Sequence, residues 1–172
     1  AGPFESHAPE EIDNLVALNV TAQFQIARAL LPRLQARDRK SGLLFVASTL
    51  GYAPVPYMAL YAASKAFVIS GAEALRAELK GGRVRIGVLA PGATRTDMID
   101  GLEATIMFSK LPFPMHHPAR VARAGLKTLA TGGHVAPGLP YKLMAWMAQH
   151  VMGPRTAANS FAGLMKGALR HG

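Results

Sequence analysis

A tyrosine and a lysine four residues apart are the side chains in this sequence best suited to chemistry. Tyr61 and Lys65 fall in an alanine-rich segment with helical character, so both are expected on one face of a helix. An ammonium beside a phenol favours the phenolate, and we therefore expect the pKa of Tyr61 to lie below its reference value of about 10. A tyrosine tuned in this way can transfer a proton at neutral pH.

A serine hydroxyl is expected to meet this phenol. Ser48 lies 13 residues before Tyr61, at the end of an apolar run, and a loop containing Gly51, Pro54 and Pro56 separates the two. Two hydroxyls that converge on one point suit a carbonyl or alkoxide oxygen whose charge changes during a reaction. Taken alone, the Tyr-x-x-x-Lys spacing is common by chance, and its plain alternative is a pair on a helix surface.

Asn19 is the one polar residue on the apolar stripe of a predicted helix over residues 9–30. A functional position and an ordinary buried, hydrogen-bonded asparagine are both compatible with this pattern. Pro9, Glu10 and Glu11 mark the start of the helix, because proline and acidic residues favour the first turn.

The elements that would position these side chains alternate between strands and helices. Short apolar runs predict strands over residues 43–47, 84–90 and 134–136, and the first run suits a strand buried on both faces. Helical patterns cover residues 61–80, 118–129, 141–152 and 156–169. This alternation predicts an α/β fold with a Rossmann-like, doubly wound parallel sheet in three layers. Its chemistry is expected past the carboxyl ends of two strands, in residues 48–61 and 91–98.

Four motifs in one order resemble the short-chain dehydrogenase/reductase family between residues 10 and 98. They are Leu18-Asn19-Val20, Val46-Ala47-Ser48-Thr49, Tyr61-Ala62-Ala63-Ser64-Lys65-Ala66 and Pro91-Gly92-Ala93-Thr94-Arg95-Thr96-Asp97-Met98. The interval of 13 residues between Ser48 and Tyr61 is also the family's.

The resemblance implies a role for each matching residue. Tyr61 would be the general acid or base, Lys65 would lower its pKa and hold the nicotinamide ribose, Ser48 would orient the substrate oxygen, and Asn19 would position a water in a proton relay. The cofactor-binding set would be Tyr61, Lys65, Pro91, Gly92, Thr94 and Thr96. The implied cofactor is NAD or NADP, which carries the hydride itself.

One part of the family's pattern is absent from these 172 residues. The sequence contains no glycine-rich G-x-x-x-G-x-G loop after a first strand. The charged residue that distinguishes NAD-binding from NADP-binding members of the family is also missing. The family places several strand–helix units before residue 9. We therefore expect a C-terminal fragment that forms one partial domain, lacks its N-terminal strands and is inactive on its own.

Charge and methionine content set the C-terminal region apart. Up to Glu103 there are eleven Lys or Arg against ten Asp or Glu, whereas the remaining residues hold eight Lys or Arg and no acid. Seven of the eight methionines lie at or beyond Met98. Residues 1–98 thus form the predicted catalytic part, and residues 99–172 a substrate lid and a basic, Met-rich C-terminal region.

An apolar segment after the last motif is the predicted substrate lid. Its apolar residues are Met98, Leu102, Ile106, Met107 and Phe108, and they indicate a small hydrophobic carbonyl or alcohol substrate of lipid-, steroid- or acyl-like character. Further along, residues 141–170 are basic and amphipathic. They could rest on an anionic membrane, cover an apolar substrate, or simply pack on the body of the protein.

The sequence thus predicts an NAD(P)-dependent oxidoreductase that interconverts carbonyls and alcohols. The alternatives are a non-catalytic membrane-surface or scaffold protein that keeps the fold, and an inactive truncated product. Small residues on the helices that carry Asn19 and Tyr61 suggest a homodimer or homotetramer, or else close packing on the sheet. We expect no nucleic-acid partner and no metal, because aromatic residues are few, cysteine is absent, and His116 and His117 are adjacent. We expect a cytoplasmic protein, a location that the absence of cysteine and of an N-terminal signal pattern permits but does not prove, with a peripheral membrane contact left open.

Overall fold

Three parallel strands form the centre of the molecule. The computed structural model describes residues 1–96 and 115–169. Strands β1 (Ser41–Val46), β2 (Val84–Leu89) and β3 (His134–Val135) lie in the order β1-β2-β3. Leu43 lies opposite Ile86, and Val88 lies opposite His134. The predicted α/β class with a parallel sheet is confirmed.

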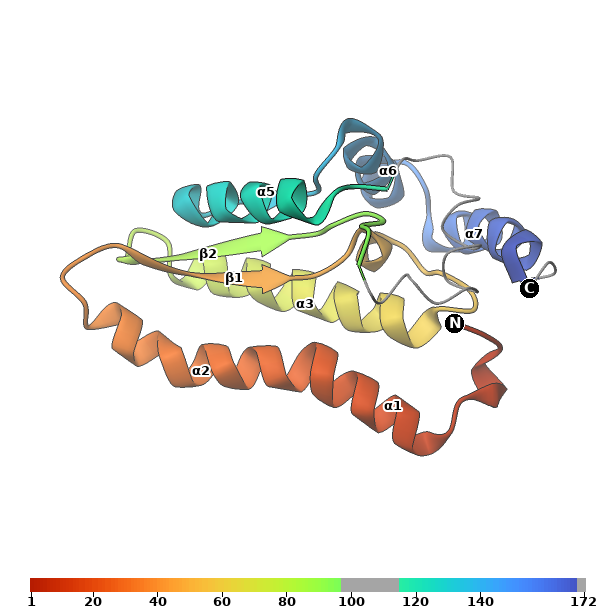
Figure 1. The fold of residues 1–172 in the computed structure, drawn as a ribbon, viewed down its shortest axis with the longest axis horizontal. Coiled ribbons are helices and arrows are strands. Elements are labelled where there is room, and N and C mark those ends of the chain that lie inside the picture. Colours follow the sequence, from red (N-terminus) through yellow and green to blue (C-terminus); the bar gives the residue numbers. More distant parts are fainter. Residues whose placement is uncertain (97–114, 170–172) are drawn as a thin grey trace.

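Helices cover both faces of this sheet (Figure 1). Helices α2 (Ala22–Gln35) and α3 (Ala59–Glu78) lie on one face, and α5 (Pro118–Thr131) lies on the other. The last two helices, α6 (Leu139–His150) and α7 (Pro154–Leu169), follow at the carboxyl end of the sheet. Since a strand presents its side chains alternately to its two faces, this arrangement buries both sides of the central strand. The predicted three-layer arrangement is confirmed.

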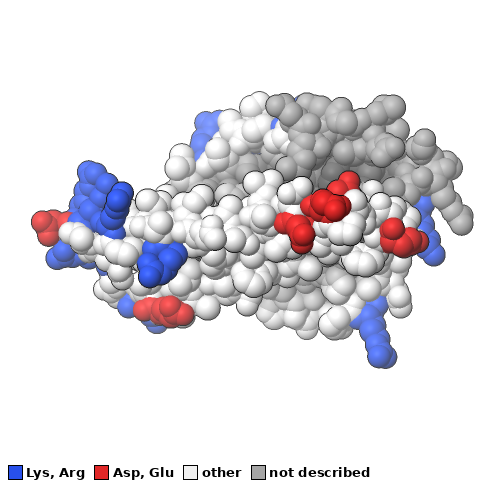
Figure 2. All heavy atoms as spheres, turned by 90° about the horizontal axis from the view of Figure 1, so that it is seen from below, with Lys and Arg blue, Asp and Glu red and all other residues white. Residues whose placement is uncertain are grey.

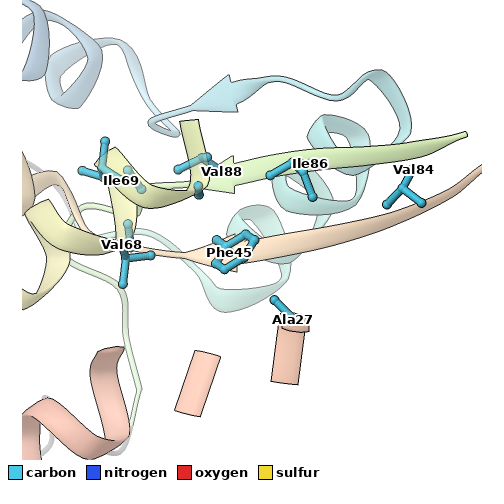
Figure 3. Packing of buried hydrophobic residues seen from close by; sticks show 10 residues of the cluster. Ala27, Phe45, Val68, Ile69, Val84, Ile86 and Val88 are labelled. Atoms are coloured by element: carbon cyan, nitrogen blue, oxygen red, sulfur yellow. The ribbon is translucent and has the colours of Figure 1, made fainter. Parts of the chain in front are cut away.

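The core lies between β1, β2 and the two helices below them (Figure 3). Phe45, Val68, Ile86 and Val88 are almost fully buried there. The prediction that the first apolar run is buried on both faces is wrong, because Val46 is 45% exposed. Among the described residues β1 pairs only with β2 and is therefore the outer strand.

The N-terminal helix is continuous but contains one π-helical turn. Helix α1 (Pro9–Val16) starts at the predicted proline, and the Glu11 carboxylate accepts a hydrogen bond from the backbone N–H of Ala8. A π-helical turn, η2 (Ala17–Thr21), then leads directly into α2. Such turns occur mostly as single insertions within α-helices and often lie at functional sites. Asn19 is the central residue of this turn.

Two short 3₁₀ turns complete the described elements, η1 (Phe4–Ser6) and η3 (Thr49–Tyr52). None of the helices in residues 1–96 and 115–169 is long and apolar enough to cross a membrane. The predicted substrate-lid residues Met98, Leu102, Ile106, Met107 and Phe108 lie outside the described residues.

Candidate active site

Tyr61 and Lys65 lie together on the first two turns of α3. Helix α3 begins at Ala59, and the Lys65 ammonium is 5.6 Å from the centre of the Tyr61 ring. Only 8% of Lys65 is exposed, and its Nζ donates a hydrogen bond to the carbonyl oxygen of Val46 at 3.4 Å. The predicted arrangement on one helix face is therefore present, with the ammonium lying over the ring.

Ser48 meets Tyr61 as the spacing predicts. It follows β1 in extended conformation, is 8% exposed, and its Oγ accepts a hydrogen bond from the backbone N–H of Leu50 at 3.2 Å. The Ser48 side chain also lies close enough to the Tyr61 hydroxyl to lower the pKa of Tyr61. The two hydroxyls thus converge at the carboxyl end of β1.

Gly51 allows the loop between these hydroxyls to pack directly on α3. A Cβ atom at Gly51 would lie 2.7 Å from the backbone carbon of Lys65 and 2.9 Å from the backbone nitrogen of Ala66. Such distances are shorter than side chains tolerate, and backbone atoms cannot move aside easily. Glycine at this position therefore lets η3, and with it Ser48, approach the helix that carries Tyr61.

The electrostatics of Tyr61 differ from the prediction. Burial raises the pKa of Tyr61 above its usual value of 10, and the nearby Ser48 side chain lowers it only in part. Burial also lowers the pKa of Lys65, because an ammonium removed from water is disfavoured. The Lys65 ammonium is directed to the Val46 carbonyl, so removal of the phenol from water outweighs attraction to the cation. The expectation that the pKa of Tyr61 lies below 10 is therefore wrong.

Asn19 is connected to the backbone of Tyr61 through a buried serine. Its Nδ2 donates to Ser64 Oγ at 3.1 Å, and the Ser64 hydroxyl donates to the carbonyl oxygen of Tyr61 at 2.7 Å. Ser64 is 5% exposed. The π-helical turn is therefore held against α3 at the tyrosine itself.

Gln23 is a neighbour that the sequence pattern did not single out. Its Nε2 donates to the Asn19 carbonyl at 2.7 Å and to the Val46 carbonyl at 3.4 Å, while its Oε1 accepts from the Val46 N–H at 3.2 Å. Gln23 thus links the π-helical turn to the end of β1, beside Lys65. The contacts with Val46 join residues 23 positions apart, which helical periodicity does not reveal.

The motif after β2 lies beside the Ser48 loop. The Pro91 carbonyl accepts a hydrogen bond from the backbone N–H of Thr49 at 2.9 Å. Thr94 Oγ1 donates to the Gly92 carbonyl at 2.9 Å, and Thr96 Oγ1 lies 3.5 Å from the Thr94 carbonyl. The two predicted segments therefore meet at the carboxyl ends of neighbouring strands.

Gly92 itself is closed off on one side. A Cβ atom there would lie 2.1 Å from the ring of Tyr141, which is buried at the start of α6. Glycine is therefore required at position 92 because the Tyr141 ring packs directly against it.

A cavity of about 550 Å³ lies on another face of α3. Its described lining is almost wholly apolar and includes Tyr52, Pro54, Val55, Ala62 and Ala66. Tyr61, Lys65 and Ser48 are not part of this lining, so the cavity is separate from the hydroxyl cluster.

The two adjacent histidines, His116 and His117, make contacts within the fold. His116 is 5% exposed and packs edge-on against Tyr141, and His117 Nδ1 accepts the backbone N–H of Ala119 at the start of α5. Within the described residues, no three side chains of the kinds that bind metals form a group.

The chain is similar in sequence to several known proteins. The family model of short chain dehydrogenases matches residues 1–106. The chain is 39% identical over 95 residues to 1-deoxy-11-beta-hydroxypentalenate dehydrogenase of Streptomyces exfoliatus, which covers 55% of this chain and 34% of that protein. It is 31% identical over 137 residues to very-long-chain 3-oxoacyl-CoA reductase-B of Danio rerio, covering 79% of this chain and 41% of the relative.

Solved structures show the same likeness. A short chain dehydrogenase from Burkholderia cenocepacia in complex with NADP matches 98% of this chain and 65% of its own, at 25% identity and a TM-score of 0.72. The matches to the two sequence relatives span 34% and 41% of those proteins. Because the family model covers more than half of the chain, together with its Ser48, Tyr61 and Lys65, this chain belongs to the short-chain dehydrogenase family.

Proposed function

We propose that this protein interconverts a carbonyl and an alcohol on a hydrophobic substrate, with NAD or NADP as cofactor. The observation that carries the proposal is the cluster of Tyr61, Ser48 and Lys65, in which two hydroxyls meet beside a buried ammonium. Its relatives are oxidoreductases by name, a dehydrogenase and a reductase. The non-catalytic scaffold and the inactive truncated product remain the alternatives that the test below separates.

In the direction of reduction, the Tyr61 hydroxyl donates its proton to the substrate oxygen. The raised pKa of Tyr61 keeps this proton on the phenol at neutral pH, and the Ser48 hydroxyl offers a second hydrogen bond to the same oxygen. When the phenolate forms, the Lys65 ammonium lies close enough to stabilise it. Asn19, held by Ser64, contributes to resupplying the proton through Lys65.

The residues at the carboxyl end of β1 fit the nicotinamide-ribose end of such a cofactor. Lys65 has three N–H donors, and within residues 1–96 and 115–169 the Val46 carbonyl is the one acceptor that it contacts, so donors remain for ribose hydroxyls. We assign Tyr61, Lys65, Pro91, Gly92, Thr94 and Thr96 to this binding region. The chemistry that a bound nicotinamide supplies is hydride transfer. The sequence itself does not distinguish NAD from NADP.

We propose an apolar substrate of lipid-, steroid- or acyl-like character. The names of the two relatives refer to a hydroxypentalenate and to a very-long-chain 3-oxoacyl-CoA. The predicted lid residues Met98, Leu102, Ile106, Met107 and Phe108 are all apolar and follow directly on the last family motif. A pocket that they help to form would favour substrates in proportion to the apolar area buried.

The test is turnover by the full-length gene product that carries this chain. Ketones of increasing alkyl length are supplied with NADPH or NADH, and consumption of the reduced cofactor is measured. We expect kcat/KM to rise with alkyl length, and Ser48→Ala to lower kcat by about 10²-fold or more, the scale of an oxyanion-hole donor. Turnover that is absent with both cofactors, or unchanged in Ser48→Ala, would reject the proposal.

We also propose that the protein is a homodimer or homotetramer located in the cytoplasm. Ala29, Ala66 and Ala74 are exposed on α2 and α3 and leave room for a second helix to approach closely. Ala27 and Ala72, in contrast, are buried in the core, which fits the alternative of packing within the chain. Light scattering of the full-length protein measures the mass directly, and a monomer at micromolar concentration would reject this part.

A further inference from the structure

Helix α6 is apolar on two opposite faces. Tyr141 and Ala145 are buried on its inner face, where Tyr141 packs against Gly92 and His116. Its outer face leaves large apolar side chains in solvent, at a spacing of three to four residues. They are Leu139 (78% exposed), Leu143 (55%), Trp146 (53%), Met147 (40%) and Val151 (62%). A contiguous apolar stripe of this kind marks a contact surface.

The outer face of α6, defined by these five residues, belongs to a part of the sequence whose Lys and Arg residues are not balanced by acidic ones. Lys142 lies on the same helix, and Arg155 follows at the start of α7; both are exposed. The sequence holds no Asp or Glu beyond Glu103. The described acidic residues lie between Glu5 and Glu78, and Figure 2 shows several of them, together with Lys and Arg side chains, on the side of α1 and α2. This side lies across the sheet from α5 and α6 (Figure 1).

We propose that the outer face of α6 is a contact surface for an anionic phospholipid bilayer. Apolar side chains at helical spacing with flanking cations bind in the plane of the bilayer interface. Trp146, which stacks on His150 at 5.6 Å, is of the residue type enriched at that depth. Each Lys or Arg near an anionic surface adds about 1 kcal/mol of attraction.

Charge makes a second copy of this chain a poorer occupant. A symmetric dimer through the outer face of α6 would bring the same surface of each copy together. Lys142 of each copy would then lie at the contact, with no acidic residue from the C-terminal region to pair with it. An anionic bilayer carries negative charge, which can pair with the basic residue on this face.

Trp146 reports on this face directly, because it is the one tryptophan of the sequence. We expect the emission of the full chain to shift to the blue on addition of vesicles of phosphatidylcholine with phosphatidylglycerol. Brominated lipid should quench that emission, and pure phosphatidylcholine vesicles should bind much less. Binding should weaken severalfold between about 0.1 M and about 1 M salt, where the screening length falls from roughly 10 Å to 3 Å.

Matched substitutions separate the apolar face from the charge. Leu143→Gln should weaken binding to the anionic vesicles by on the order of ten- to a hundredfold, the scale of one leucine side chain leaving an apolar environment. Lys142→Gln should weaken it by about fivefold. Ile26→Gln removes a similarly exposed apolar side chain (58%) from α2, across the sheet, and should leave binding unchanged.

Three results would overturn the proposal. The first is Trp146 emission unaffected by anionic vesicles. The second is a blue shift that depends on protein concentration without lipid, which would assign the face to a second copy. The third is a blue shift caused only by cofactor and apolar ketone, which would assign it to the substrate. Since vesicle binding needs no turnover, failure here is distinguishable from failure of the proposed reaction.

Discussion

At the scale of single residues, the site combines two groups whose burial works against their charged forms. The pKa of Tyr61 is raised and that of Lys65 is lowered, and burial is the largest cause for both. A raised pKa suits a proton donor, and a buried ammonium costs stability that the fold must supply elsewhere. We therefore infer that Lys65 is kept for chemistry at the expense of stability.

Replacing Lys65 with methionine should stabilise the protein while removing activity. Because the pKa of Lys65 is lower in the folded than in the unfolded chain, the fold disfavours the charged form at neutral pH. This penalty disappears as the pH rises through the lowered pKa toward the ordinary value of 10.5. We expect Lys65→Met to raise Tm at pH 7, with about 1 kcal/mol corresponding to roughly 2–4 °C, and to lose this advantage above about pH 10.

Thermal unfolding at several pH values checks this prediction. Lys80→Met is the control, because Lys80 is exposed just past the end of α3. A Lys65→Met variant that is less stable than the parent at pH 7 would show that its hydrogen bond to Val46 outweighs the cost of burial.

At the scale of elements, one close approach determines where Ser48 lies. The turn η3 packs on α3 at Gly51. Its first residue, Thr49, donates a backbone hydrogen bond to Pro91, which follows β2. The strand ends, the turn and the helix are therefore fixed to one another around the two hydroxyls. Displacing η3 from α3 should separate Ser48 from Tyr61.

Gly51→Ala should consequently impair both stability and activity. The added methyl would meet the backbone of Lys65 and Ala66, and overpacking of this kind costs about 1–3 kcal/mol. We expect Tm to fall and kcat to fall by more than the loss of folded protein explains. Urea unfolding and cofactor consumption by the full-length protein measure the two effects.

Gly163→Ala is the matched control for this substitution. No atom lies within 4 Å of a Cβ at Gly163, which is in the helical part of α7. Alanine there should stabilise by roughly 0.5–1 kcal/mol. Equal effects of the two substitutions would contradict the role given to Gly51.

At the scale of the whole molecule, a polar network connects three distant parts of the chain. Tyr52 Oη is hydrogen-bonded to His134 Nε2, and His134 Nδ1 is 2.8 Å from Glu73 Oε1. Arg76 Nη2 pairs with Glu73 Oε2 at 2.5 Å. The network thus links η3, α3 and the edge strand β3.

Glu73→Gln should lower the pKa of Tyr52. Burial raises that pKa most, and the Glu73 carboxylate raises it further by repelling the phenolate. Removing the charge leaves only the effect of burial, so the shift should be downward but not to the ordinary value of 10. Titration of the Tyr52 ring followed by NMR measures it, with Glu78→Gln, an exposed position at the end of α3, as control. An unchanged titration would show that Glu73 does not act on Tyr52.

Local patterns in the sequence predicted the elements and the site but not this network. Apolar runs predicted the strands, and the glycines after residue 80 predicted the end of α3. Four short motifs predicted that Asn19, Ser48, Tyr61 and Lys65 belong to one site. Gln23, Ser64 and the partners of His134 act over 23 to 82 residues of sequence, and such contacts leave no periodic signal. The exposure of Val46 depends on the strand neighbours of β1, which the apolar run alone does not indicate.

The most direct test of the account is the activity of Tyr61→Phe in the full-length protein. Only a hydroxyl is lost, so Tm should change little, since a hydrogen bond contributes about 0.5–1.5 kcal/mol. Proton transfer by a placed side chain is worth about 10²–10⁴-fold, and kcat should fall by that factor. Tyr57→Phe, outside the hydroxyl cluster, should retain activity. A Tyr61→Phe enzyme that turns over apolar ketones at the parent rate would contradict the assignment of Tyr61 as the proton donor.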